Sequence, residues 1–389
     1  MEVRDMPTMG VSVYPDLSPF EEIQDYLALA GKYGAKRVFS SMFSVEGTKE
    51  EIFDYFKKLI DEAHKYGMEV SLDVNTRFLE DMGVTPDNVK DFADIGCDII
   101  RMDEAYGDER DAVMINNPYG IKIEYNASTV APMIGRLLAD GADKDKILAC
   151  HNFYPQPWTG MPWAKFKAVN QGIKDLEDIR IGAFISSNAE GTNGVWDAEY
   201  GLPTVERMRK YPVDLQARLI LATDNVDDVL FGNYYASEDE FKAVSDVLNP
   251  EPVDNLVPGY IPDEKLTKPK TIKVELNPDI TEAEKKSVLE FAPHADQGDS
   301  SEWIWRSRLP RVYFKGTDFP PRDPGKKMFE RGDVVVVNDN YKHYAGEVHI
   351  VLEPMENDGL RNLVGKVSGP ELDMIDLLKP NDVVVFKEA

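Results

Sequence analysis

Carboxylate, amide and hydroxyl side chains gather at the ends of several short apolar runs in this sequence. The clusters are Ser71-Leu-Asp73-Val-Asn75, Arg101-Met-Asp103-Glu104, Glu124-Tyr-Asn126-Ala-Ser128 and His151-Asn152-Phe-Tyr154-Pro155. Two positioned carboxyl groups, one protonated and one ionised, are the machinery that most glycoside hydrolases use. Amides and an aromatic ring beside them suit a hydroxyl-rich ligand, because amides satisfy paired hydroxyls and an aromatic face covers a sugar ring. These residue types and spacings are compatible with such acid/base chemistry, but they do not by themselves select a reaction.

Other catalytic signatures are missing from the sequence. It has no H-E-x-x-H motif and no closely spaced cysteine pair, and its histidines are scattered: His64, His151, His294, His343 and His349. It also lacks the G-x-S-x-G motif of a serine nucleophile elbow. We therefore expect neither a metal nor an organic cofactor at the site.

The elements that must position these clusters follow a regular alternation of apolar strands and amphipathic helices from residue 9 to about residue 248. Strands are predicted at Gly10–Tyr14, Arg37–Ser41, Glu69–Asp73, Asp98–Asp103, Lys122–Asn126, Ile147–Asn152, Ile181–Ser186 and Asp228–Gly232. Helices are predicted at Pro19–Tyr33, Thr48–Tyr66, Asn88–Ile95, Val130–Asp140, Trp163–Leu176, Thr204–Ala222 and Ser237–Leu248. Eight strand–helix repeats indicate a (β/α)₈ TIM barrel, an α/β fold. The competing fold, a doubly wound open sheet, often carries a Gly-rich phosphate turn after its first strand, and none follows Tyr14 here.

The chain of 389 residues is long enough for two domains, and the regular alternation of strands and helices ends after Leu248. We place the barrel at residues 1–250, a Pro-rich linker at 251–269 and a small β-barrel or sandwich at 270–389. The strands predicted in this last part are Lys270–Leu276, Trp303–Trp305, Arg311–Phe314, Asp333–Val337, Glu347–Leu352 and Asp382–Phe386.

Strand alternation predicts which polar side chains share a face. Asp73 lies on the same face as Ser71, and Asp103 on the same face as Arg101, so we expect both carboxylates at the mouth of the barrel lumen. Other interpretations stay open. Asp103 could serve only as the salt-bridge partner of Arg101, Asp73 could cap the following helix, and His151 could be a core histidine.

The formal net charge of −26 and the pI of about 4.6 disfavour nucleic acid and anionic membranes as partners. A phosphorylated ligand would need a local basic cluster, and the densest is Arg306-Ser307-Arg308-Leu-Pro-Arg311. We predict that Arg306, Ser307 and Arg311 bind phosphate, since arginine suits bidentate phosphate contacts. The alternative is that these arginines pair with surface acids.

The location expected from the sequence is the cytoplasm. No apolar run of signal-peptide length follows the N-terminus, and nowhere do about 18 apolar residues run together. The two cysteines, Cys97 and Cys150, lie in strand-like apolar runs, as expected for reduced core residues.

Several motifs resemble those of one known family, over nearly the whole chain. They are Gly10-Val-Ser-Val-Tyr-Pro15, Ile100-Arg-Met-Asp103, Asn126-Ala-Ser128, His151-Asn-Phe-Tyr-Pro155, Thr159-Gly160, Gly201-Leu-Pro-Thr-Val-Glu206, Arg331-Gly-Asp-Val334 and Tyr344-Ala-Gly-Glu347. Together they resemble the MupG-like 6-phospho-N-acetylmuramidases, an intracellular glycoside hydrolase family.

The resemblance implies a TIM barrel joined to a cyclophilin-like β-barrel. It also implies cleavage of N-acetylmuramic acid 6-phosphate from N-acetylglucosamine in the recycling of cell-wall fragments. The carboxylates that match are Asp73 and Asp103, with Glu199 as a third candidate. The substrate contacts expected at the barrel are Tyr14, Arg101, Asn126, His151, Asn152, Tyr154 and Asn233; at Asn233 relatives are expected to carry Asp.

Two other classes of function stay open at this point. One is a different TIM-barrel enzyme, a lyase or epimerase acting on a sugar phosphate. The other is a non-enzymatic sugar-binding or surface protein, which the missing apolar leader disfavours. The expected partner is a small phosphorylated disaccharide, and homo-oligomer formation is left open.

Overall fold

The computed structural model describes residues 6–42, 45–195, 200–323 and 325–389. The chain divides into two compact units, with the boundary between Leu248 and Asn249.

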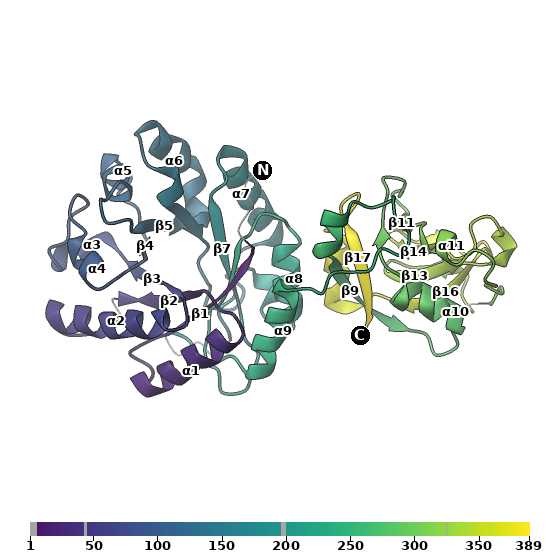
Figure 1. The fold of residues 1–389 in the computed structure, drawn as a ribbon, viewed down its shortest axis with the longest axis horizontal. Coiled ribbons are helices and arrows are strands. Elements are labelled where there is room, and N and C mark those ends of the chain that lie inside the picture. The colour runs from purple at the N-terminus through teal and green to yellow at the C-terminus, as the bar shows by residue number, and fades with distance from the viewer. Residues whose placement is uncertain (1–5, 43–44, 196–199, 324) are drawn as a thin grey trace. The chain divides into compact units, whose positions relative to one another are not determined.

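The first unit is a closed barrel of eight parallel strands in the described part of the chain, in the order β1 to β8 (Figure 1). Its strands are β1 (Thr8–Ser12), β2 (Arg37–Ser41), β3 (Glu69–Val74), β4 (Ile99–Met102), β5 (Lys122–Asn126), β6 (Ile147–Cys150), β7 (Arg180–Ile185) and β8 (Asp228–Phe231). Each predicted strand is present, with ends that differ by a few residues at most. The TIM-barrel prediction is therefore confirmed.

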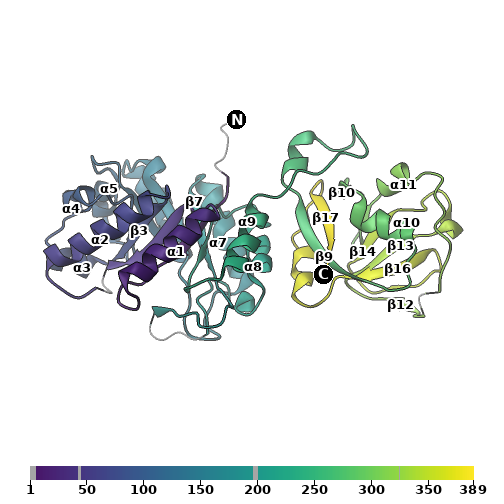
Figure 2. The ribbon, with the colours of Figure 1, turned by 60° about the horizontal axis from the view of Figure 1, so that its bottom comes forward.

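Helices surround this barrel (Figures 1 and 2). They are α1 (Phe20–Lys32), α2 (Lys49–His64), α3 (Thr76–Asp81), α4 (Lys90–Asp94), α5 (Glu109–Ile115), α6 (Ala127–Ala139), α7 (Trp163–Leu176), α8 (Val213–Leu221) and α9 (Glu238–Leu248). Sequence patterns did not predict the short helices α3 and α5. The single helix predicted over Thr204–Ala222 is wrong: a 3₁₀ turn at Glu206–Met208 is followed by α8, which starts directly after Pro212.

Local signals in the sequence explain where several helices begin and end. Thr48 and Glu51 form the predicted capping box at the start of α2. Gly67 has a φ of 68°, a left-handed conformation that suits glycine and that stops the helical turn after α2 from continuing. Asn75 caps α3, because its side chain accepts a hydrogen bond from the Phe78 amide.

The second unit contains a seven-stranded sheet, counted over the described residues, in the order β10-β17-β9-β16-β13-β14-β11. The strands of this unit are β9 (Lys270–Leu276), β10 (His294–Ala295), β11 (Ile304–Ser307), β12 (Met328–Phe329), β13 (Asp333–Val337), β14 (Val348–Val351), β15 (Met355–Glu356), β16 (Arg361–Lys366) and β17 (Val383–Glu388). The edge strands β10 and β11 are joined by a contact of 3.0 Å between His294 Nδ1 and Ser307 Oγ. The sheet therefore curls into a nearly closed barrel.

The α-helices described in the second unit are short: α10 (Glu282–Lys285), α11 (Pro310–Tyr313) and α12 (Leu372–Ile375). The strand predicted at Arg311–Phe314 is wrong, because these residues lie mainly in α11. Pro310 stands at the first helical position, where its fixed φ favours a helical start. The other five predicted strands are present.

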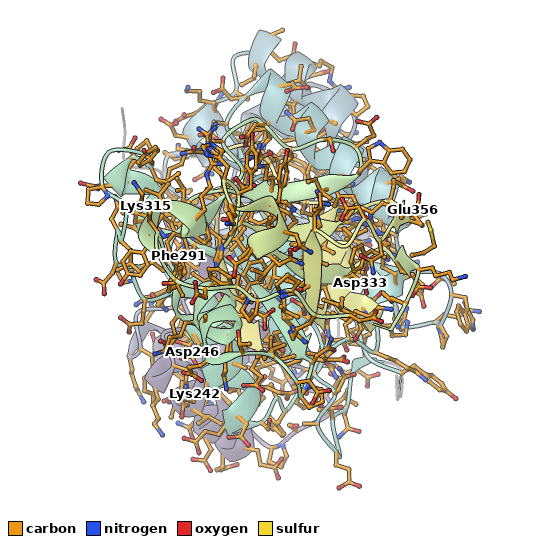
Figure 3. All side chains as sticks on the ribbon, turned by 90° about the vertical axis from the view of Figure 1, so that its right-hand side faces the viewer. Lys242, Asp246, Phe291, Lys315, Asp333 and Glu356 are labelled. Atoms are coloured by element: carbon orange, nitrogen blue, oxygen red, sulfur yellow. The ribbon has the colours of Figure 1, made fainter. Side chains whose placement is uncertain are left out.

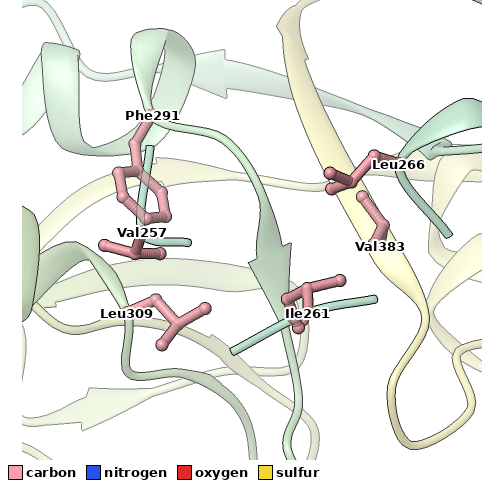
Figure 4. Packing of buried hydrophobic residues seen from close by; sticks show 7 residues of the cluster. Val257, Ile261, Leu266, Phe291, Leu309 and Val383 are labelled. Carbon is pink, nitrogen blue, oxygen red and sulfur yellow. The ribbon is translucent and has the colours of Figure 1, made fainter. Parts of the chain in front are cut away.

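The Pro-rich segment 251–269 belongs to the core of the second unit (Figure 4). Its residues Val257, Ile261 and Leu266 are each at most 7% exposed and pack in one cluster with Phe291 and Val383. Burying apolar side chains of this size contributes about 1.5–3 kcal/mol each. This segment thus stabilises the β domain as well as connecting it to the barrel.

Charged side chains lie on the outer faces of the barrel helices. On α9, for example, Lys242 and Asp246 form an exposed ion pair of 2.6 Å, one helical turn apart (Figure 3). Among the described residues, no helix is both long and apolar enough to cross a membrane.

Candidate functional site

Two carboxylates and one arginine meet at the C-terminal ends of β3 and β4. Asp73 is the register partner of Arg101 on the neighbouring strand, and Asp103 follows β4, its amide donating to the Val74 carbonyl at 2.9 Å. Arg101 Nη1 donates a hydrogen bond to Asp73 Oδ1 and lies 3.8 Å from Asp103 Oδ1. The structure therefore brings Asp73 and Asp103 together around one guanidinium nitrogen.

Further contacts fix the Arg101 side chain in place. Its Nη2 donates to the side-chain oxygen of Asn152, which follows β6. Its guanidinium carbon lies 5.7 Å from the centroid of the Phe39 ring, as in a cation–π contact. Arg101 is only 3% exposed, so the planar group is held between strands and orients both carboxylates.

The two carboxylates differ in their surroundings. Burial raises the pKa of Asp73 to about 6; the Arg101 guanidinium opposes this, and the negative charges of Asp103 and Glu124 add to it. The Asp103 side chain is 48% exposed, whereas that of Asp73 is 10% exposed. A carboxyl group with a pKa near neutrality can hold and donate a proton, and a solvated carboxylate beside it can carry negative charge.

A buried charge network lies beneath this site in the barrel lumen. Glu124 on β5 accepts hydrogen bonds from Arg37 Nη2 at 2.6 Å and from Ser71 Oγ at 3.2 Å, and its Oε2 lies 4.0 Å from Arg101 Nε. Arg37 also donates to Asp228 at 2.8 Å. We did not predict this network, although the sequence carries a signal for it: Arg37 and Asp228 are charged residues at the first positions of two buried strands.

The structure places His151 away from these carboxylates. Its ring is fully buried against Phe166, with Nε2 at 2.6 Å from Asn170 on α7 and Nδ1 at 3.2 Å from Ser128 on α6. Burial lowers the pKa of His151 to about 4, so the ring is neutral at physiological pH. These contacts favour the interpretation of His151 as a core histidine, and we leave it out of the proposed sugar contacts.

Three other predicted substrate contacts serve the local structure. The Asn126 side chain caps α6 by accepting from the Ser128 amide at 3.0 Å. Tyr14 is buried and donates to the Gly232 carbonyl at 2.5 Å. Asn233 is 1% exposed and both donates to and accepts from the Ser187 backbone, at 2.9 and 2.7 Å.

One further predicted residue lies on the loop after β6. Tyr154 is half-buried, and its carbonyl accepts a hydrogen bond from Arg209. Glu199 lies outside the described residues.

The predicted phosphate-binding residues lie in the second unit. Arg306 donates two hydrogen bonds of 2.8 Å to the Glu347 carboxylate, and Arg311 Nη1 lies 3.0 Å from the same group. Both guanidiniums also face the Tyr344 ring, at 5.6 and 4.9 Å from its centroid. Ser307 is buried against His294. The arginines are thus gathered in one cluster around Glu347, which is a buried acid and not one of the surface acids of the alternative interpretation.

Within the described residues, no three His, Cys, Asp or Glu side chains lie so that they could hold a metal ion.

Comparison with known proteins assigns both parts of the chain. Residues 9–246 match the family model described as 6-phospho-N-acetylmuramidase, N-terminal, and residues 270–387 match the corresponding C-terminal model. A solved structure of an uncharacterized B. cereus protein is 32% identical with a TM-score of 0.83, and the match covers 98% of this chain and 100% of that one.

A conserved Enterococcus faecalis protein of unknown function shares the fold, with 20% identity, a TM-score of 0.67 and coverage of 98% of this chain and 96% of that one. A search of curated proteins gave no match. On the strength of two family models that together span almost its whole length, the chain belongs to the 6-phospho-N-acetylmuramidase family.

Proposed function

We propose that this protein hydrolyses the glycosidic bond between N-acetylmuramic acid 6-phosphate and N-acetylglucosamine. The observation that carries the proposal is the placement of Asp73 and Asp103 on one arginine nitrogen at the barrel mouth. The family names support the reaction class, since both domains match 6-phospho-N-acetylmuramidase models. A pair of carboxyl groups with different surroundings is what glycoside hydrolysis requires.

In this proposal Asp73 is the general acid. Its pKa of about 6 lets it keep a proton close to neutral pH and donate it to the oxygen of the departing sugar. Asp103 is the carboxylate that acts on the other side of the bond. It attacks the anomeric carbon, activates a water molecule, or orients the 2-acetamido group of the substrate for internal attack. Arg101 positions both groups.

We further propose that the reaction takes place in the cytoplasm, on cell-wall fragments that the cell recovers. The two cysteines, Cys97 and Cys150, are buried and not joined in a disulfide, which agrees with a reducing compartment.

The direct test is incubation of the full-length protein with the phosphorylated disaccharide, with products analysed by mass spectrometry. Hydrolysis releases two monosaccharides whose summed mass exceeds the substrate by one water. A lyase would give fragments without that water, an epimerase would leave the mass unchanged, and a binding protein would retain the disaccharide intact. Any of these last three results would contradict the proposal.

Substitution of Asp103 tests the assignment of the site. We expect Asp103→Asn to lower kcat by a factor on the order of 10²–10⁴ while leaving thermal unfolding unchanged, because the carboxylate is exposed and its loss leaves no buried charge. The matched control is Glu104→Gln, which removes the neighbouring exposed carboxylate and should keep full activity. Near-normal turnover by Asp103→Asn would remove this residue from the mechanism.

A further inference from the structure

An exposed tryptophan stands on the loop that follows β6. Trp158 is 89% exposed, the highest value among the large apolar side chains of the described residues. Tyr200, on the loop that follows β7, is 60% exposed. Loops at this end of a TIM barrel carry the residues that bind substrate. Exposing an indole to water is unfavourable, which suggests that a ligand covers Trp158 during function.

The backbone beneath Trp158 is fixed. Glu206 accepts hydrogen bonds from the amides of Trp158 and Gly160, both at 2.8 Å. The Arg209 guanidinium and these two amides lower the pKa of Glu206 to about 2, so the carboxylate is charged throughout the physiological range. A side chain at position 160 would clash, because a Cβ there would lie 2.8 Å from the Glu206 Cα.

Arg209 ties the two loops to each other. It is 6% exposed and donates to the carbonyls of Tyr154 at 2.9 Å, Gln156 at 3.3 Å and Gly201 at 3.0 Å. It also forms an ion pair of 2.5 Å with Glu206. One buried guanidinium therefore holds the loop after β6 against the loop after β7.

The backbone conformation of Trp158 is unusual for its residue type. Its φ is 72°, in the left-handed region that non-glycine residues rarely adopt and that costs on the order of 1 kcal/mol or more. The hydrogen bonds that the Trp158 and Gly160 amides donate to Glu206 hold the segment in this conformation and keep the indole in solvent. Strained residues held in this way are often found at ligand-binding sites.

The same loop begins beside the arginine that holds the two proposed catalytic carboxylates. Asn152 binds Arg101, the partner of Asp73, and the Asn152 carbonyl accepts a hydrogen bond of 3.0 Å from Thr204 on the other loop. The segment that presents Trp158 is thus linked through side-chain contacts to the proposed general acid.

We propose that Trp158 is a sugar-binding residue whose indole stacks on the uncharged N-acetylhexosamine of the substrate, on the leaving-group side of the bond. The inference rests on the proposed function and adds a subsite to it. Arg209, the buried cation that joins the two loops, is engaged by Glu206 and by carbonyl oxygens and is not offered to a phosphate, whereas the exposed indole offers an uncharged face that suits the neutral sugar. An aromatic face covers the apolar C–H face of a pyranose ring.

The kinetic test compares two substrates of the full-length protein. One is the phosphorylated disaccharide, and the other is 6-phospho-N-acetylmuramyl fluoride, whose leaving group is too small to reach a stacking platform. We expect Trp158→Ala to lower kcat/KM for the disaccharide by about tenfold and to leave kcat/KM for the fluoride unchanged. Trp158→Phe should restore most of the loss. Equal losses on both substrates, or no loss on the disaccharide, would overturn the inference.

A binding test separates this inference from the proposed function. N-acetylglucosamine is titrated into the protein while tryptophan fluorescence is followed, with Trp303→Ala as the control for an exposed tryptophan of the second unit. We expect a saturable change in fluorescence that persists in the Trp303→Ala variant and is absent from the Trp158→Ala variant. No change with the wild-type protein would overturn it. If the wild-type protein cleaves neither substrate yet shows this titration, the proposed function falls and the sugar subsite stands.

Discussion

The protonation of Asp73 depends on side chains from several strands. Burial keeps its proton on, the Arg101 guanidinium favours its release, and the carboxylates of Asp103 and Glu124 favour its retention. The balance leaves the pKa at about 6, close to the pH at which a general acid works best. The site therefore responds to charge changes in the lumen as well as at the mouth.

A pH profile follows from this value. A general acid must be protonated, and the protonated fraction of Asp73 falls as the pH rises through about 6. We expect kcat/KM for the disaccharide to decline above that pH, by about tenfold per unit. A profile that stays flat well into the alkaline range would contradict the assignment of Asp73 as the acid.

Glu124 should act on this profile from a distance. It touches neither carboxylate directly, yet its negative charge raises the pKa of Asp73. Glu124→Gln should therefore move the alkaline limb to lower pH, because Asp73 loses a like charge and keeps Arg101. Ser71→Ala is the matched control: it deletes a hydrogen bond to Glu124 without changing charge, and should leave the limb in place. An equal shift in both variants would indicate a merely structural effect.

At the residue scale, strand-end position predicted part of the site. Asp73 and Arg101, near the ends of β3 and β4, meet Asp103 and Asn152, which follow β4 and β6. His151 is the residue before Asn152 and so faces the opposite side of the strand, where it meets helices. Alternation could have separated the two, because only one of two adjacent residues can face the lumen.

At the scale of elements, the eight barrel strands could be predicted because short runs rich in apolar residues recur about every 30 residues, each followed by a helix-sized segment. The strands of the second unit were harder. β16 reads Arg361-Asn-Leu-Val-Gly-Lys366, whose polar residues and glycine hide its pairing with β13, and Pro310 turned a β-like run into the start of α11. The ion pair between Glu206 and Arg209, which joins the loops after β6 and β7, could not be predicted, because these loops meet only in the folded barrel.

Substitution of Arg209 should disturb the packing of the two loops against each other. Arg209→Ala deprives four loop carbonyls and Glu206 of their donor. We expect the free energy of unfolding to fall by about 1–3 kcal/mol. The KM for the disaccharide should rise as well, since the loop carrying Trp158 is released. Thermal unfolding and steady-state kinetics measure both effects. Lys210→Ala, which removes an exposed charge from the next residue, should change neither.

At the scale of the whole molecule, a strongly acidic protein is proposed to bind an anion. In the arginine cluster of the second unit, three guanidiniums (Arg306, Arg308 and Arg311) meet two carboxylates (Asp299 and Glu347), so these five groups carry one excess positive charge. That excess is small against the overall charge of −26, but it is local. Phosphate binding by this cluster stays a prediction.

Substitution of Arg311 tests it. If Arg311 binds phosphate, Arg311→Ala should weaken binding of the phosphorylated disaccharide by tenfold or more, on the order of the value of a charge-assisted hydrogen bond, and hardly affect the dephosphorylated one. Calorimetric titration of both ligands measures the difference. Lys315→Ala, an exposed cation nearby in sequence, is the control. Equal weakening for both ligands would assign the phosphate to residues of the barrel loops.

The segment before β9 determines where the second domain can be cut when it is transferred between genes. Sequence similarity to the C-terminal family model begins at residue 270, yet Val257, Ile261 and Leu266 fill the domain's core. A gene fusion that cut at residue 270 would strip three buried side chains and leave their apolar neighbours, Phe291 and Val383 among them, open to water and to aggregation. A cut at residue 249 would carry the complete core along. The piece that recombination can move intact therefore starts some twenty residues before the region that the C-terminal family model matches.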